Sequence, residues 1–134
     1  MNELVIDTNI FIYALDKNSM FNKISSDLLT GNDNALFTTT KNISEIFAIT
    51  SKLNVSRTLI NRFYAEVKLN IGILFPSNQS LEIFERLIKK YKPIGNRVYD
   101  FEIVSIMLSY DIKQIATFNK KDFVEIEEIK LLAL

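Results

Sequence analysis

The sequence predicts an α/β fold in which helices lie on both faces of a central, mostly parallel sheet of four or five strands. Short apolar runs alternate with longer segments of helical periodicity, and strands separated in this way pair in parallel within a covered sheet. The chain has 134 residues, only three Gly and two Pro, and no linker, repeat or low-complexity tract. We therefore expect a single three-layer α/β/α domain over residues 1–134.

The predicted strands are short apolar runs, and they are Leu4–Ile6, Ala35–Thr38, Ile71–Phe75 and Gln114–Thr117, with a weaker run at Ile129–Leu132. The carboxyl ends of parallel strands meet at one edge of a sheet, which is where open α/β folds bind ligands. Side chains that follow these strands are therefore the first candidates for a functional site.

Apolar residues at helical spacing predict five helices, over residues 24–29, 43–53, 59–67, 81–91 and 101–108. Gly31 follows the first of them in the position that Gly favours after a helix. Ser56 precedes the third and is a good N-cap. The fifth is apolar on both sides, which predicts a central position or a subunit interface.

The residue types that the chain lacks narrow its chemistry. It has no Cys and no His, which excludes a disulfide framework, a thiolate nucleophile, a His-containing triad and imidazole metal ligands. Catalysis would have to use carboxylates, hydroxyls, Lys, Arg, Tyr or a metal-bound water. The formal net charge is zero, so any attraction for nucleic acid would have to come from a local patch.

Apolar content and the N-terminal residues give two further expectations. The hydrophobic fraction is 48%, with ten Phe, and we expect a homodimer or a permanent partner to cover the excess apolar surface. The N-terminus has no basic region followed by a long apolar stretch, and no apolar segment is long enough to span a bilayer. We therefore expect a cytoplasmic protein without membrane contact.

Asp7 is the first candidate functional residue, because it ends the apolar run Leu4–Ile6 and is followed by Thr8 and Asn9. A buried strand that ends on Asp places the carboxylate at the carboxyl edge of the sheet. Two interpretations remain open. In one, Asp7 or its two polar successors cap a short helix that begins near Ile10. In the other, Asp7 is a metal ligand whose orientation is fixed by Thr8 or Asn9.

Three more acidic residues lie at predicted helix starts. Glu45 follows Asn42 at the spacing of a capping box. Asp100 opens the fifth helix, where the helix dipole would stabilise its charge. Asp122 follows Asn119, again at capping-box spacing. Local helix chemistry therefore explains each of these positions as well as a metal site does.

The four acids taken together are harder to explain as helix starts. Asp7 and the Asn119 turn both follow strands, and Glu45 follows Ala35–Thr38 closely, so these positions share one edge of the sheet. Two like charges ~4 Å apart cost about 4 kcal/mol at an effective dielectric near ~20 unless a cation lies between them. Oxygen ligands favour Mg²⁺ or Mn²⁺. Such an ion activates water for attack on a phosphodiester without a histidine.

Four segments carry a resemblance to a known family. In order they are Val5-Ile6-Asp7-Thr8-Asn9, Glu45 at a helix start, Asp100 opening an apolar helix, and Thr117-Phe118-Asn119 with Asp122-Phe123. The chain resembles the PIN-domain proteins over nearly its whole length, and most of all the VapC ribonuclease toxins of toxin–antitoxin pairs. The resemblance implies a PIN-like nuclease domain, an RNA substrate, Mg²⁺ or Mn²⁺ as cofactor, and a small antitoxin protein as partner.

The resemblance also implies roles for individual residues. Asp7 and Asp100 would be the principal metal ligands, and Glu45 would complete the acidic catalytic pocket. Polar side chains around these acids would support them, namely Thr8, Asn9, Thr117 and Asn119. Where many relatives have an acid two residues after the Thr of the last motif, this chain has Asn119. The fourth carboxylate therefore comes from Asp122 or is missing, which leaves open whether one metal binds or two.

Basic residues flank the acidic ones. Residues 86–97 include five positive charges and no acid and lead to Asp100, while Lys120 and Lys121 adjoin the last motif. Groups of this kind would hold RNA phosphates, and Arg97, Lys120 and Lys121 are the predicted contacts. A solvated basic end of the fourth helix explains the charges of residues 86–97 equally well.

Three functions are compatible with these observations. The favoured one is a metal-dependent endoribonuclease that acts as the toxin of a toxin–antitoxin pair. The alternative is a catalytically silent PIN-fold module that binds RNA or protein. A phosphatase or phosphotransferase acting through Asp7 is disfavoured, because Asp7-Thr8-Asn9 lacks the second nearby Asp expected of phospho-aspartate enzymes.

Overall fold

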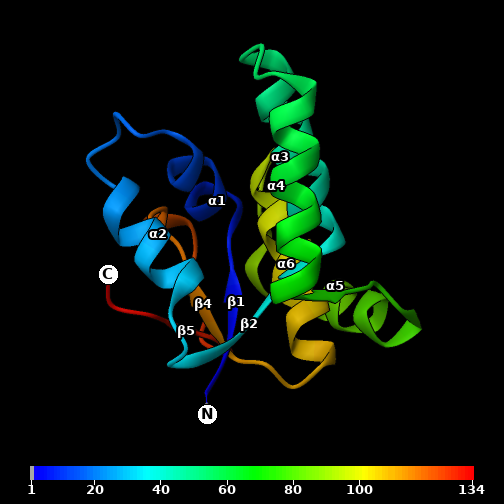
Figure 1. Cartoon of the computed structure of the whole chain (residues 1–134). Coiled ribbons are helices and arrows are strands. Elements are labelled where there is room, and N and C mark those ends of the chain that lie inside the picture. The colour runs from blue at the N-terminus through cyan, green and yellow to red at the C-terminus, as the bar shows by residue number, and fades with distance from the viewer. Residues whose placement is uncertain (1) are drawn as a thin grey trace.

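The computed structural model describes residues 2–134, which form a five-stranded sheet covered by six α-helices (Figure 1). The strands are β1 (Asn2–Ile6), β2 (Asn34–Thr39), β3 (Gly72–Leu74), β4 (Gln114–Ala116) and β5 (Lys130–Leu131). The helices are α1 (Thr8–Leu15), α2 (Asn22–Thr30), α3 (Thr40–Lys52), α4 (Arg57–Asn70), α5 (Asn78–Tyr91) and α6 (Arg97–Ser109), with the short 3₁₀ helix η1 (Lys120–Asp122) before β5. The predicted α/β fold class is confirmed.

The strand order is β3-β2-β1-β4-β5, and every neighbouring pair is parallel. The central strand β1 therefore lies between β2 and β4, with Val5 aligned to both Phe37 and Ile115. After β1 the chain builds one side of the sheet with β2 and β3, and then crosses to the other side with β4 and β5. The carboxyl end of β1 is thus a topological switch point, where open α/β sheets form a crevice.

Alternating residues of β1 build the two cores of the molecule. Leu4 and Ile6 are fully buried and pack with residues of α1, α3 and α4, among them Phe11. Val5 is also fully buried, but it packs with residues of α5 and α6, among them Phe101. Because side chains alternate across a strand, one apolar run serves both helical layers. Each helix of residues 2–134 is too short or too polar to cross a bilayer.

The connection between α5 and α6 determines where Asp100 lies. Helix α5 ends at Tyr91, because the next residue, Lys92, has a left-handed φ of 51°. Gly95 follows with a φ of 64°. Helix α6 then begins at Arg97, so that Asp100 lies in its first turn and not at its first residue. A change of direction through two positive φ angles favours Gly at one of them.

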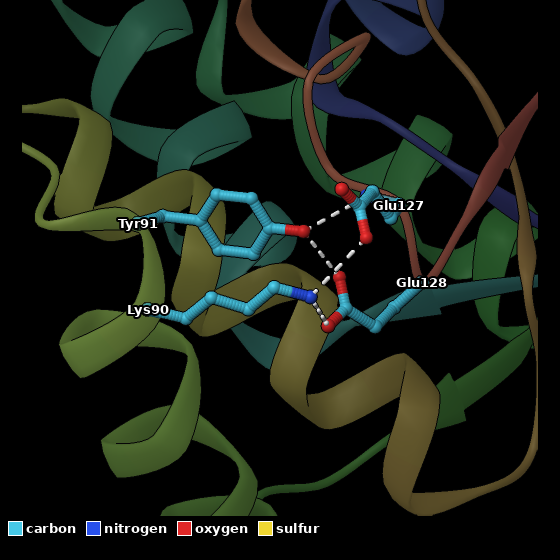
Figure 2. A network of polar contacts seen from close by, with 4 residues as sticks. All are labelled: Lys90, Tyr91, Glu127 and Glu128. Atoms are coloured by element: carbon cyan, nitrogen blue, oxygen red, sulfur yellow. Dashed lines mark hydrogen bonds and ion pairs between the residues drawn. The ribbon is translucent and has the colours of Figure 1, made fainter.

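A polar network fastens the end of α5 to the segment that leads into β5 (Figure 2). The Tyr91 hydroxyl donates to Glu128 Oε1 at 2.6 Å and accepts from the Glu127 backbone N–H at 2.9 Å. Lys90 Nζ lies 2.9 Å from Glu128 Oε2. Hydrogen bonding to Tyr91 and Lys90 outweighs partial burial and lowers the pKa of Glu128. The network holds the C-terminal segment against α5.

We expect Tyr91→Phe to lower the free energy of unfolding by about 1–2 kcal/mol, because it removes one hydrogen bond to a carboxylate and one to the backbone. Denaturant unfolding measures the loss. The Tyr64 hydroxyl makes no hydrogen bond within residues 2–134, so Tyr64→Phe is the control and should change stability little. Equal effects in the two variants would show that the network does not stabilise the fold.

Candidate active site

The Asp7 carboxylate lies at the carboxyl end of β1 and is only 7% exposed. Asp7 Oδ1 accepts from the Thr8 N–H at 2.8 Å and from Asn42 Nδ2 at 3.1 Å. Asp7 Oδ2 accepts from Thr117 Oγ1 at 2.7 Å and from Asn9 Nδ2 at 3.4 Å. Asp7 is the N-cap of α1, and the other donors hold it in one orientation. The cap interpretation is therefore confirmed, and it does not compete with a role in a site.

Asn42 is the residue that connects α3 to Asp7. It is fully buried, and its amide group also donates to Thr8 Oγ1 at 3.0 Å. Its side-chain oxygen accepts from Thr39 N at 3.2 Å and from Thr39 Oγ1 at 2.6 Å. Both polar atoms of the Asn42 side chain therefore make two hydrogen bonds each.

The predicted capping box between Asn42 and Glu45 is wrong. Thr39, the last residue of β2, is the N-cap of α3, and its reciprocal partner is Asn42. The helix begins earlier than predicted because the extended Thr39 already presents a hydroxyl to the Asn42 N–H at 3.2 Å. Glu45 is consequently not engaged in capping. A Thr at a strand end, three residues before a buried polar residue, was the signal that the prediction missed.

Glu45 lies in the second turn of α3 and is partly buried. Its Oε1 atom is buried and receives no hydrogen bond from residues 2–134. Burial and the nearby Asp7 charge raise the pKa of Glu45, while the positive charge of Lys41 opposes them. A buried carboxylate oxygen without a donor is costly, and a cation at this atom would offset that cost.

Asp100 completes the group from the opposite helix layer. Burial raises the pKa of Asp100 to about 7, assisted by the charges of Asp7, Asp122 and Glu45, and Arg97 acts in the other direction. The charge of Asp122 likewise contributes to the raised pKa of Asp7, whose main cause is burial. The four predicted acids therefore interact electrostatically near the carboxyl end of β1.

The turn after β4 brings the last motif to the same place. Thr117 Oγ1 accepts from the Asn119 N–H at 3.0 Å, and Asn9 Oδ1 accepts from the Phe118 N–H at 3.1 Å. The Asn119 side chain donates to the Asp122 carboxylate. The predicted box at Asn119 is wrong, because that side chain makes no cap bond to the backbone of η1. Asn119 instead orients Asp122.

The three predicted RNA contacts lie in different settings. Arg97 donates to the Asp122 backbone carbonyl at 3.0 Å, and its guanidinium lies 5.8 Å from the centre of the Phe101 ring. Arg97 therefore joins the start of α6 to η1. Lys120 and Lys121 are exposed on η1.

The residues present fit a hard cation by their chemistry. The acidic groups are carboxylates, burial and then repulsion between them raise the pKa values of Asp7, Glu45 and Asp100, and one buried oxygen of Glu45 lacks a donor. No three acidic side chains of residues 2–134 lie close enough together to coordinate one ion among themselves. That spacing suits Mg²⁺, which usually binds through one or two carboxylates and keeps several waters.

Comparisons with known proteins agree with this geometry. The sequence model of the PIN domain family matches residues 4–129. A chain of the VapBC2 structure from Rickettsia felis, bound to a DNA fragment from their promoter, superposes with a TM-score of 0.77 at 20% identity, covering 97% of each chain. VapC20 of Mycobacterium tuberculosis, a Sarcin-Ricin loop cleaving toxin, gives a TM-score of 0.72 at 10% identity, covering 92% of this chain and 95% of that one. No curated protein matches by sequence.

A parallel α/β sheet with a group of acidic side chains at the carboxyl end of its central strand defines the class of protein. Within that class, the chain belongs to the PIN domain family, because the family match spans nearly all of it. Its fold is that of chains in solved VapBC complexes, including VapBC-1 of nontypeable Haemophilus influenzae at a TM-score of 0.68, 20% identity and coverage of 97% of this chain and 96% of that chain.

We expect Asn42→Ala to reduce the free energy of unfolding by about 2–3 kcal/mol, because it leaves buried polar atoms of Thr39 and Asp7 without partners. Denaturant unfolding measures this loss. Asn70 is an exposed Asn whose side chain donates to the Glu66 carbonyl, and Asn70→Ala should cost only a few tenths of a kcal/mol, ~0.5 or less. A loss no larger at Asn42 than at Asn70 would contradict the assigned role.

We expect Asp100→Asn to stabilise the metal-free protein at pH 8 and to have little effect at pH 4. The pKa of Asp100 is raised to about 7 in the folded protein, so folding favours the protonated carboxyl, and the stability this provides is lost as pH rises from about 4 to 7. A pKa unit corresponds to about 1.4 kcal/mol. Solvent screening of this partly exposed group and the lost helix-dipole interaction both reduce the effect. We therefore expect the free energy of unfolding at pH 8 to rise by about 1 kcal/mol.

Thermal unfolding in EDTA at both pH values measures the effect. Asp111→Asn removes an exposed carboxylate that lies 3.7 Å from Lys113, and it serves as the matched control. A gain for Asp100→Asn that does not depend on pH would contradict the electrostatic explanation.

Proposed function

We propose that this protein is a Mg²⁺- or Mn²⁺-dependent endoribonuclease and the toxin of a toxin–antitoxin pair. One observation carries the proposal: Asp7, Glu45 and Asp100 converge at the switch point of a PIN-family sheet, and their pKa values are all raised. Neighbouring carboxylates repel one another, and a bound cation would remove that repulsion. The VapC20 relative, which cleaves the Sarcin-Ricin loop, supports RNA as the substrate.

The acidic residues of the site differ in how firmly hydrogen bonds hold their side chains. Asp7 is held by four donors and would be the fixed ligand of a bound ion, whereas Glu45 and Asp100 would reach the ion from helices α3 and α6. A bound Mg²⁺ or Mn²⁺ would supply an activated water and stabilise the leaving oxygen of the phosphodiester.

Exposed basic side chains beside the site support RNA as the substrate. Lys120 and Lys121 on η1 are exposed beside Asp122 and suit phosphate binding. Arg97 supports the same surface by fixing the η1 turn.

Partners are also part of the proposal, namely a small antitoxin and a second copy of the chain. The similar solved structures include VapBC assemblies. Exposed apolar side chains occur on α3, on α4 and in the turn between them, namely Ile49, Leu53, Leu59 and Leu69. Apolar surface of this kind is what a partner covers.

The experiment that tests the proposal is RNA cleavage by purified protein. We expect cleavage of single-stranded or looped RNA with Mg²⁺ or Mn²⁺ and none with EDTA. Asp7→Asn and Asp100→Asn should each reduce the rate at least ~100-fold, the loss typical when electrostatic stabilisation of a transition state is removed. Each variant should still unfold cooperatively, since Asn is nearly isosteric with Asp.

Asp111→Asn is the control, because Asp111 is exposed and lies after the far end of α6, and it should cleave like wild type. Full activity in both site variants would overturn the assigned site. RNA binding without cleavage by the wild type would favour a binding module.

A further inference from the structure

Tyr99 and Lys41 form a pair at the edge of the acidic site. Tyr99 immediately precedes Asp100 in the first turn of α6, and its side chain is 48% exposed. Lys41 lies in the first turn of α3, one turn before Glu45, and its Nζ is 4.0 Å from the centre of the Tyr99 ring. The pair therefore bridges the two helices that carry Glu45 and Asp100.

Lys41 is a cation that no carboxylate neutralises by contact. The ion pairs among residues 2–134 do not include it, although its charge acts on Glu45. Arg97, by contrast, is committed to the Asp122 carbonyl and has a buried Nε without a partner. Lys41 thus offers a positive charge to a phosphate on the side of the site formed by α3 and α6.

The Tyr99 ring has the properties of a stacking platform. Lys41 lies over the ring, and about half of the side-chain surface stays open to solvent. Single-stranded nucleic acid binds to surfaces that combine an exposed aromatic ring with a cation near the backbone, since any base can stack. Tyr110 is similarly exposed but has no cation of residues 2–134 over its ring, so Tyr99 is distinguished by exposure together with Lys41.

We infer that a base of the RNA strand stacks on Tyr99 and that Lys41 contacts the phosphate beside it. The contact holds the strand so that a neighbouring phosphodiester lies at Asp7 and Asp100. This inference rests on the proposed function and adds the residues that bind the substrate next to the cleaved bond.

The first test uses the absence of Trp from the chain. Tyr99→Trp places a single Trp at the proposed contact, and a stacked base quenches its fluorescence. The probe is a short single-stranded RNA in EDTA and low salt, compared with an abasic chain of the same length. We expect quenching by the RNA and little by the abasic chain.

Tyr110→Trp is the matched control for this measurement. Tyr110 follows the other end of α6 and is 46% exposed, close to the exposure of Tyr99. Its fluorescence should not respond to either chain. Quenching that is equal at the two positions, or absent from Tyr99→Trp, overturns the inference.

The second test measures RNA affinity by fluorescence anisotropy in EDTA. Loss of one stacked base predicts that Tyr99→Ala binds roughly 5- to 150-fold more weakly, while Tyr99→Phe binds like wild type. Lys41→Gln should weaken binding and lower the slope of log affinity against log salt by about 0.7, the value for one phosphate contact on a single strand. Lys113→Gln is the control and should change neither quantity. Lys113 directly precedes β4, so it lies at the amino-terminal ends of the strands, away from the site at their carboxyl ends.

The outcomes separate this inference from the proposed function. Cleavage by wild type with unchanged affinity in Tyr99→Ala and Lys41→Gln overturns the inference alone. Neither binding nor cleavage by wild type overturns both.

Discussion

The hydrogen bonds to the Asp7 carboxylate are the constraint on which the rest of the site depends. Four donors reach it, from the residues that follow β1, from α3 beyond β2, and from the end of β4. Burying a carboxylate is costly unless it is hydrogen-bonded. The three neighbouring strand ends must therefore be in register around β1 before Asp7 can be accommodated. The parallel order of the sheet and the position of the charge are two aspects of one arrangement.

The carboxylates around Asp7 are an energetic cost to the folded protein. Glu45 and Asp100 receive few compensating interactions, and burial and repulsion raise their pKa values. The surrounding structure bears this cost through two fully covered apolar cores and through the network that fastens the C-terminal segment to α5. Functional sites that retain unfavourable charge on a well-packed scaffold are common in proteins.

The fold and the proximity of the four acids to one another could be predicted from the sequence, because apolar periodicity and strand-end residues are local signals. The roles of these acids in a metal site stay predictions. The start of α3 could not be predicted, since a capping box at Asn42 and Glu45 looks as good locally as the true one at Thr39. Only the pairing of β2 with β1, which brings Asn42 to Asp7, decides between them.

Similar limits apply to single charged and aromatic residues. A cation near the site looks the same in sequence whether it binds the turn, as Arg97 does, or lies over a ring, as Lys41 does. Their surroundings come from residues distant in the chain, which periodicity does not report.

The spacing of the Asp7 donors along the chain also determines when the site comes into being. Thr8 is adjacent to Asp7, but Asn42 is 35 residues away and Thr117 is 110 residues away. Closing a loop of that length costs conformational entropy, and the contacts that offset this cost form only when β4 pairs with β1. A chain still emerging from the ribosome holds Asp7 without Thr117, and its acidic residues are not yet gathered. The carboxylate group is assembled only when nearly the whole polypeptide has been made, so the site is completed together with the fold.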